Sequence, residues 1–291
     1  QDEAINTSIV GYRASDLAKV AQAKYPVPLS FIIPCSLFDE FLDASGIRPR
    51  ISSIYQKEPQ TIDGYTRAYK ELLQLFYNVK FSRLLKEELL DSYASLAIPK
   101  NSSATYLVED EEDPTVILIP SPDYLVTPDR LRGARQNING KEIFLDTIKD
   151  CWASFFLPEK VMERQHYGIT RASTAIIVQQ QLPVTGSAEG KYRKKDASPI
   201  QIATYLGSLD ILGEITKDQF SIAAEHLQIN NKVIREQQTK LIIGDEPGIF
   251  LEGSVGNEGV EQSLTDRQVL EVARLTKRTH VTLGEDSRIL W

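Results

Sequence analysis

The side chains that could carry chemistry in this 291-residue chain are few, and most are isolated from one another. Cys35 and Cys151 each lie in an apolar stretch, so we expect two buried, unpaired thiols, as in a reducing compartment. The three histidines, His166, His226 and His280, are far apart, and no Cys/His spacing predicts a zinc site. We therefore expect each histidine to lie on a helix surface or to pack, rather than to bind a metal or act as a base.

Two runs of like charge are better explained as solvated loops than as ligand sites. Residues 109–113 are all acidic, but consecutive side chains cannot all point at one metal ion. The basic run of Lys191, Arg193, Lys194 and Lys195 is flanked by Gly and Ser, which favours a solvated loop over a phosphate site. The net charge of −7 provides no global basic field, so we predict no nucleic-acid partner.

The composition is that of a globular protein with a sizeable core, since 42% of residues are hydrophobic and 25% are charged. No apolar run reaches the ~20 residues that a membrane-spanning helix needs, so no span is predicted. The chain begins with Gln1 rather than methionine, which leaves a processed or trimmed product and a removed targeting segment open. We expect a cytoplasmic location or a reducing organelle lumen or stroma.

Helices are expected to dominate the first third of the chain. Residues 16–24 have helical composition and are followed by helix-breaking prolines. An apolar strand is expected at 31–33, and a helix at 37–44 that ends at Gly46. From 61 to 96 the apolar residues recur with helical spacing, which predicts a helical subdomain inserted between strand-bearing parts.

Short strands are expected in the remainder, at residues 116–119, 174–178, 200–205, 220–222 and 241–243. An amphipathic helix is predicted over 141–156. Residues 183–199 are polar and rich in Gly, Ser and Lys, which predicts a loop, and 252–262 read as a linker. The last helix should begin at an N-cap, either Ser263 or Thr265.

Several segments resemble, in order, the N-terminal ATP-grasp region of phosphoenolpyruvate synthases and pyruvate dikinases. The family's G-x-K-x-x-N-L-A turn and helix resembles residues 11–18, and its V-P-x-G-F strand resembles 27–31. Its R-S-S-A-T segment resembles 101–105, and its K-x-C-W-A-S-L-F helix is similar to 149–156. The later matches are P-V-T-G at 183–186, A-S-Y-G-L-G-E at 203–208, G-E-V-T-P-D-E-Y at 213–220, L-T-D-E-Q-V-L-E-L-A-R-L at 264–275 and Q-D-I-E-W at 287–291.

The resemblance implies an α+β, ATP-grasp-like fold with mixed sheets and an inserted helical subdomain. Its expected parts are the N-terminal part of the ATP-grasp domain at 1–60, the helical insert at 61–97, the strand-rich core at 98–251, and a linker with the C-terminal helix and strand at 252–291.

Phosphoryl transfer needs cations around the phosphates and carboxylates on Mg²⁺, and this chain departs from the family at those positions. The resemblance implies a Lys in the first turn, an Arg before S-S-A-T, a Glu after G-L-G, and Gln, Asp and Glu on the last strand. These positions hold Arg13, Asn101, Ser208, Ser287, Arg288 and Leu290. Only Arg13 keeps the family's charge, and Arg is not equivalent to Lys at a tight phosphate site.

The changes at the metal position are the more serious. Leu290 offers no oxygen ligand, and Arg288 places a cation where the divalent ion would bind. A shift of one residue would let Lys100 replace the lost Arg. The nearest acids to the terminal strand are Glu285 and Asp286, which no such shift restores completely.

Two further departures concern whole segments. The family's V-S-G-V-x-F-T strand is expected to be deleted, because residues 179–182 run straight into Pro183. The chain ends at Trp291, before the family's phosphohistidine and pyruvate-binding domains. We therefore expect that the full dikinase cycle cannot run on this chain.

The leading hypothesis is a pseudoenzyme, an ATP-grasp scaffold kept as a binding or structural subunit without a cofactor. Charged ligands are lost together while a helix such as 147–156 keeps its packing residues. Its partner would be another protein subunit, or a nucleotide held without metal.

The alternative is an active ATP- and Mg²⁺-binding subunit of a split dikinase or phosphotransferase, which phosphorylates a histidine on a partner chain. Arg13 and Lys100 would then meet phosphate, and Glu285 or Asp286 the metal. A third reading is an unrelated α+β binding protein with chance matches.

Overall fold

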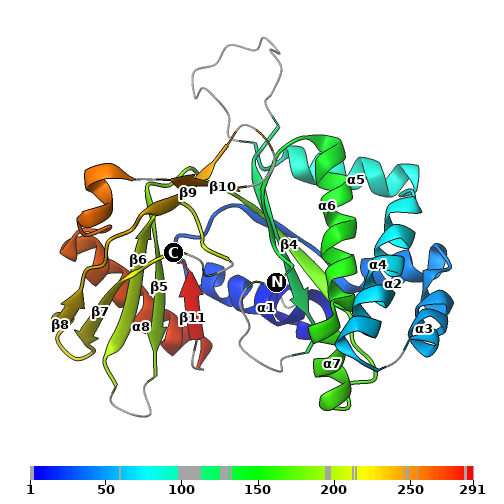
Figure 1. The fold of residues 1–291 in the computed structure, drawn as a ribbon, viewed down its shortest axis with the longest axis horizontal. Helices are drawn as coiled ribbons and strands as arrows, with labels where there is room; N and C mark the ends of the chain where they lie inside the picture. Colours follow the sequence, from blue (N-terminus) through cyan, green and yellow to red (C-terminus); the bar gives the residue numbers. More distant parts are fainter. Residues whose placement is uncertain are drawn as a thin grey trace, which may run out of the picture. The chain divides into compact units, whose positions relative to one another are not determined.

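The computed structural model describes residues 3–58, 60–97, 113–124, 131, 133–193, 198–211, 213, 215–244, 246, 249–253, 255–284 and 287–290, with backbone only at 249–253, 287 and 288. The chain divides into two compact units, each considered by itself (Figure 1). Unit 1 comprises Gln1–Ala18 and Val27–Gln181, and unit 2 comprises Lys19–Pro26 and Leu182–Trp291. The parts expected to end at residues 60, 97 and 251 remain a prediction.

Unit 1 is built on a four-stranded antiparallel sheet. Its strand order is β1 (Ser30–Ile33), β4 (Thr174–Gln180), β2 (Val116–Pro122) and β3 (Arg135–Ile138). The strands expected at 31–33, 116–119 and 174–178 are confirmed, because apolar and β-branched side chains fill buried positions in each. The polar strand β3 was not expected from its sequence.

Helices cover this sheet and share its core (Figure 1). They are α2 (Cys35–Ala44), α3 (Ile47–Lys57), α4 (Ile62–Asn78), α5 (Arg83–Ala94), α6 (Lys141–Ala153), the 3₁₀ turn η2 (Ser154–Phe156) and α7 (Pro158–His166). Trp152 of α6 lies at the centre, with the Phe41 ring 4.8 Å and the Phe38 ring 5.9 Å from it between centroids. Leu72 and Phe76 of α4 belong to the same buried cluster as β2 and β4. The helices expected over 61–96 therefore pack into the sheet's own core.

The first helix, α1 (Thr7–Gln22), follows a short 3₁₀ turn, η1 (Glu3–Ile5). It starts earlier than the helix expected at 16–24, and it contains a break at Gly11, where φ is 74° and ψ is 169°. Residues up to Ala18 belong to unit 1, and the last residues of the helix belong to unit 2.

Unit 2 contains a five-stranded antiparallel sheet and a separate two-stranded ribbon (Figure 1). The sheet order is β11 (Ser287–Leu290), β5 (Gly186–Tyr192), β6 (Ile200–Leu206), β7 (Asp218–Ala223) and β8 (Gln228–Val233), and the ribbon pairs β9 (Thr239–Ile243) with β10 (Ile249–Gly253). The strands expected at 200–205, 220–222 and 241–243 are confirmed. The edge strand β8 was not expected, because four of its six residues are polar and five are exposed.

The loop expected over 183–199 is wrong, because residues 186–192 form β5 between β6 and β11. The strand β5 begins after Pro183, so the deletion of a family strand before that residue stays a prediction. The glycines that suggested a loop are required by close packing instead. A Cβ on Gly190 would lie 2.1 Å from Thr276 Oγ1 on the helix α8 (Asp266–Leu283). Gly in a strand here permits the close approach of a helix.

The helix α8 covers one face of this sheet, where Ala188, Ile202, Phe220, Val269 and Ala273 form a second buried cluster. Thr265 is its N-cap, and a reciprocal capping box with Gln268 confirms one of the two expected start sites. The segment predicted as a linker at 252–262 contains the end of β10 and the 3₁₀ turn η4 (Gly256–Val260).

The segment Lys19–Pro26 is attached to α8. The Tyr25 hydroxyl lies 3.1 Å from Thr282 Oγ1, and the Arg278 guanidinium lies 4.4 Å from the Tyr25 ring centre. Within the described ranges, no helix combines the length and apolar character needed to cross a bilayer.

Candidate functional site

The first candidate region in unit 1 is the turn that carries Arg13. Its guanidinium Nη1 donates a 2.7 Å hydrogen bond to the carbonyl oxygen of Pro120 on β2. One residue on, the Ala14 N–H donates to Ser121 Oγ at 3.0 Å. A Cβ at Gly11 would lie 1.9 Å from the Ser121 carbonyl oxygen, so only glycine fits there. These contacts hold α1 against β2 at and just after the break at Gly11.

The strand β2 can offer these acceptors because its pairing with β3 ends at Leu118, opposite Arg135. Beyond that point β2 pairs with β4 alone, and Pro120, which has no N–H, lies opposite Ile176. Ser121 is completely buried. Sequence reasoning missed both Pro120 and Ser121, because neither resembles a ligand type and both lie more than a hundred residues from the turn that they contact.

Several predicted site residues cannot be placed. Lys100, Asn101, Glu285 and Asp286 lie outside the described residues, as do most of the acidic run and part of the basic run. Ser208 is described in unit 2, where it is buried and its N–H donates to the Leu241 carbonyl oxygen at 2.8 Å.

The terminal strand β11 pairs antiparallel with β5. This register places Arg288 opposite Lys191, and Leu290 opposite Glu189. Directly opposed residues of an antiparallel pair share a face of the sheet. Leu290 therefore lies on the face that carries Glu189, whereas Ala188 lies in the buried cluster under α8.

A buried group of charges is centred on Lys217, which directly precedes β7. Its ammonium lies 3.0 Å from Asp210 Oδ2 and 3.5 Å from Glu189 Oε2. The side chains of Asp210, Glu189 and Lys217 are 1%, 9% and 16% exposed. Lys191 also approaches Glu189, at 3.4 Å, but is 60% exposed. We call Glu189, Asp210 and Lys217 the ion triad.

The connection between β6 and β7 is folded around Asp210. Its carboxylate accepts hydrogen bonds from the Gly213 N–H at 2.6 Å and the Ile215 N–H at 3.3 Å. Its own N–H donates to the Tyr205 hydroxyl at 3.0 Å. The Lys217 ammonium lies 4.8 Å from the centre of the Tyr205 ring. Burial raises the pKa of Tyr205 to about 12, so its phenol stays neutral.

No residue of the ion triad was predicted, because its members are far apart in sequence. The alternation in β5 is the one signal that could have identified Glu189. Gly186, Ala188 and Gly190 are small and face α8, while Ser187 and Glu189 lie at the intervening positions.

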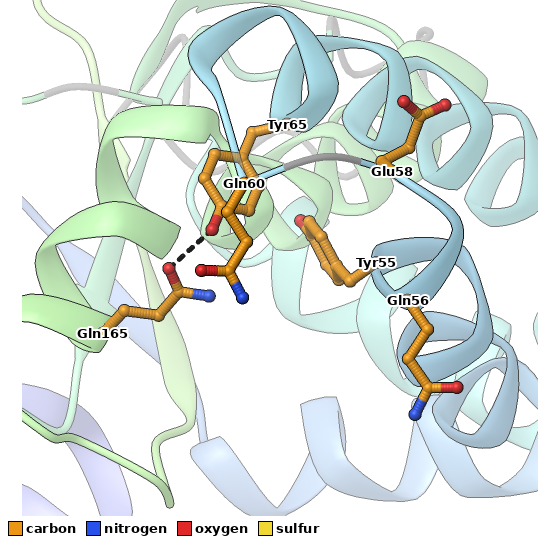
Figure 2. Close-up of a pocket in the computed structure, with 6 residues that line it drawn as sticks. All are labelled: Tyr55, Gln56, Glu58, Gln60, Tyr65 and Gln165. Carbon is orange, nitrogen blue, oxygen red and sulfur yellow. Dashed lines mark hydrogen bonds between the residues drawn. The ribbon is translucent and has the colours of Figure 1, made fainter.

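A pocket of about 380 Å³ occurs elsewhere in unit 1, between α3, α4 and α7 (Figure 2). It is lined by Tyr55, Gln56, Glu58, Gln60, Tyr65 and Gln165. The Tyr65 hydroxyl bonds Gln165 Oε1 at 2.7 Å, and Glu58 pairs with Arg67 at 2.7 Å. The three glutamines are exposed to solvent, so this pocket is a surface hollow without a free charge.

The cysteines and histidines behave largely as expected. Cys35 and Cys151 are free and buried, and burial raises the pKa of each thiol to about 12. His166 and His226 are exposed, whereas His280 is buried on α8 with its ring 5.1 Å from Tyr192. Among the residues described, no group of three or more His, Cys, Asp or Glu side chains is placed to hold a metal ion.

Comparison with known proteins agrees with the resemblance seen in the sequence. The sequence model of the family described as "Pyruvate phosphate dikinase, AMP/ATP-binding domain" matches residues 7–108 and 134–289. The unmatched stretch between them contains β2, and so contains Pro120 and Ser121.

Individual relatives are distant. A probable phosphoenolpyruvate synthase of Archaeoglobus fulgidus is 22% identical over 302 residues, covering 97% of this chain and 38% of the relative. The phosphoenolpyruvate synthase of Aeropyrum pernix is 22% identical over 329 residues, which cover 97% of this chain and 38% of the relative. An uncharacterized phosphotransferase of Bacillus subtilis, YvkC, is 24% identical over 307 residues, which cover 96% of this chain and 31% of the relative. The chain thus spans between 31% and 38% of the length of these relatives.

Proposed function

We propose that this chain, which belongs to the pyruvate phosphate dikinase AMP/ATP-binding family, is a non-catalytic ATP-grasp-like scaffold that acts as a binding or structural subunit. The observation that carries the proposal is the 2.7 Å bond from the Arg13 guanidinium to the Pro120 carbonyl oxygen. The resemblance gives this first-turn position to a lysine that serves the phosphates. In this chain the corresponding cation binds its own unit instead.

The surroundings of Arg13 make this contact costly to give up. Swinging the guanidinium toward a ligand would leave the Pro120 carbonyl without its donor at a partly buried place. The backbone next to Arg13 is also held, by the Ala14 bond to Ser121 and by the tight fit of Gly11. A cation recruited for phosphate would be expected to keep its donors free.

The terminal strand of unit 2 supports the same proposal, because it offers poor ligands for Mg²⁺. Mg²⁺ needs oxygen ligands, but the terminal strand presents the apolar Leu290 opposite Glu189. Glu189 itself is already contacted by two ammonium groups, those of Lys191 and Lys217. Such a scaffold would need neither Mg²⁺ nor another cofactor, and its partner would be a second protein subunit or a nucleotide held without metal.

The alternative is the ATP-binding part of an active phosphotransferase that passes phosphate to a histidine on a partner chain. Two observations favour it. The family is that of an AMP/ATP-binding domain, and the chain spans only about a third of the length of relatives named as a synthase and a phosphotransferase. Phosphate would then be met by Lys100, and Mg²⁺ by Glu285 or Asp286. All three lie outside the described residues.

Thermal unfolding with ATP, in the presence and absence of Mg²⁺, separates the two. A ligand at a hundred times its dissociation constant stabilises the folded state by about 2.7 kcal/mol, which is visible as a higher Tm. We expect no Mg²⁺-dependent shift of Tm at millimolar ATP. A shift that requires Mg²⁺, and that disappears in Arg13→Ala but persists in Arg50→Ala, would favour the active subunit.

A further inference from the structure

The proposed function uses only the contact between Glu189 and Lys217, and leaves the buried Asp210 of the ion triad unexplained. We propose that Lys217 is a tethered counter-ion that occupies the place of an exchangeable cation between Glu189 and Asp210, and so locks the β6–β7 connection. This inference does not depend on whether the chain binds ATP.

The buried carboxylates of Asp210 and Glu189 need a cation close to them. The carboxylates of Asp210 and Glu189 are almost fully withdrawn from solvent, and a buried carboxylate is stable in its charged form only when it is paired. The ammonium of Lys217 is within 3.5 Å of both and is itself largely buried. One ammonium group therefore contacts both carboxylates.

The contacts of Lys217 join the β6–β7 connection to the strand β5. Asp210 is the fourth residue of the β6–β7 connection and Lys217 is its last, whereas Glu189 lies on the neighbouring strand β5. The Asp210 carboxylate also bonds the N–H groups of Gly213 and Ile215. The ammonium therefore ties a connection folded around one carboxylate to a second carboxylate that is fixed in the sheet.

Lys217 and Lys191 both contact Glu189, but they differ in burial. Lys191 contacts Glu189 as well, but its side chain is mostly in solvent, where an ion pair contributes little. The ammonium of Lys217 itself lies over the Tyr205 ring, 4.8 Å from its centre, and this cation–π contact helps to hold it in place. Removing the Lys217 charge would leave both buried carboxylates without their shared ammonium, and hard divalent cations prefer such oxygen ligands.

The test compares Lys217→Met with the matched control Lys191→Met, since both remove an ammonium from Glu189. Without divalent ions, we expect the Tm of Lys217→Met to fall by several degrees and that of Lys191→Met to stay near the wild-type value. Addition of Mn²⁺ should restore much of the Tm of Lys217→Met alone, and paramagnetic resonance should detect about one bound Mn²⁺. Adding Asp210→Asn to Lys217→Met should abolish Mn²⁺ binding. An unchanged Tm, or a lowered Tm indifferent to Mn²⁺, would overturn the proposal.

A measurement on the unmodified chain decides the matter if Lys217→Met does not fold. Hydrogen exchange of the Gly213 and Ile215 amides reports directly on the bonds to Asp210. We expect protection of both amides to be the same in EDTA as in Mn²⁺. Protection that is lost in EDTA and regained with Mn²⁺ would mean that an exchangeable ion, and not Lys217, holds the connection.

Discussion

Gly190 of β5 and Thr276 of α8 approach so closely that a Cβ at residue 190 would lie 2.1 Å from the threonine Oγ1. This contact explains why a strand in the centre of a sheet carries a glycine-rich sequence. It also fixes the distance between α8 and the face of the sheet that it covers.

We predict that Gly190→Ala lowers the free energy of unfolding by about 1–3 kcal/mol, as expected for overpacking of a tight contact. Urea denaturation would measure the change. The double variant Gly190→Ala/Thr276→Ala removes the clashing hydroxyl and should recover part of the loss as a favourable coupling energy. Additive effects of the two substitutions would show that the two residues do not meet.

The contact between Arg13 and Pro120 predicts a stabilising role for a residue that the family resemblance assigns to phosphate. Arg13→Ala should lower the free energy of unfolding by about 1–2 kcal/mol, because a charged donor is lost from a partly buried carbonyl. Arg50→Ala, on the exposed face of α3, is the matched control and should change it by less than about 0.5 kcal/mol. Equal and small effects of the two substitutions would argue that Arg13 is free to serve a ligand.

The capping box of α8 predicts a position-specific effect. Thr265→Ala should destabilise the chain by about 1 kcal/mol, because the Gln268 N–H loses its acceptor at the helix start. Thr265→Ser keeps the hydroxyl and should recover most of the stability, as judged from the urea midpoint. A Ser variant as unstable as the Ala variant would place the helix start elsewhere.

The thiols of Cys35 and Cys151 predict a stability that falls at high pH. Burial raises the pKa of each from its ordinary value of 9.0 to about 12 in the folded chain. Between these values the unfolded state loses thiol protons that the folded state keeps, so stability should be constant below pH 9 and decline above it. A disulfide-exchange reagent at pH 8 should react with both thiols only in denaturant. Rapid reaction of either thiol in the native chain would contradict the burial.

The elements that could be predicted from sequence are those with local signals. The helical spacing over residues 61–96, the N-cap at Thr265 and the apolar strand at 174–178 each depend on neighbouring residues. Local signals failed at β5, because glycines that permit helix packing are indistinguishable in sequence from glycines that form a loop. They also failed at β8, which has no buried face to create an alternating pattern.

The candidate site was predicted less well than the fold, because its contacts join distant residues. Arg13 was identified from its place in a motif, but its partner Pro120 is 107 residues away. The ion triad joins three residues of ordinary type, whose meeting depends on the pairing of β5 with β6. No spacing rule applied to one segment at a time would have brought them together.

Calorimetric titration of the chain with ATP, with and without Mg²⁺, distinguishes a non-catalytic scaffold from an active ATP-binding subunit. We expect Mg²⁺ to add no heat of ATP binding, since Arg13 is bonded to Pro120 and Leu290 of the terminal strand lies opposite Glu189 of β5. Weak binding that is the same in both conditions would agree with a nucleotide held without metal. Tight binding that requires Mg²⁺ would contradict a non-catalytic scaffold, and would direct the search to a partner chain that carries an acceptor histidine.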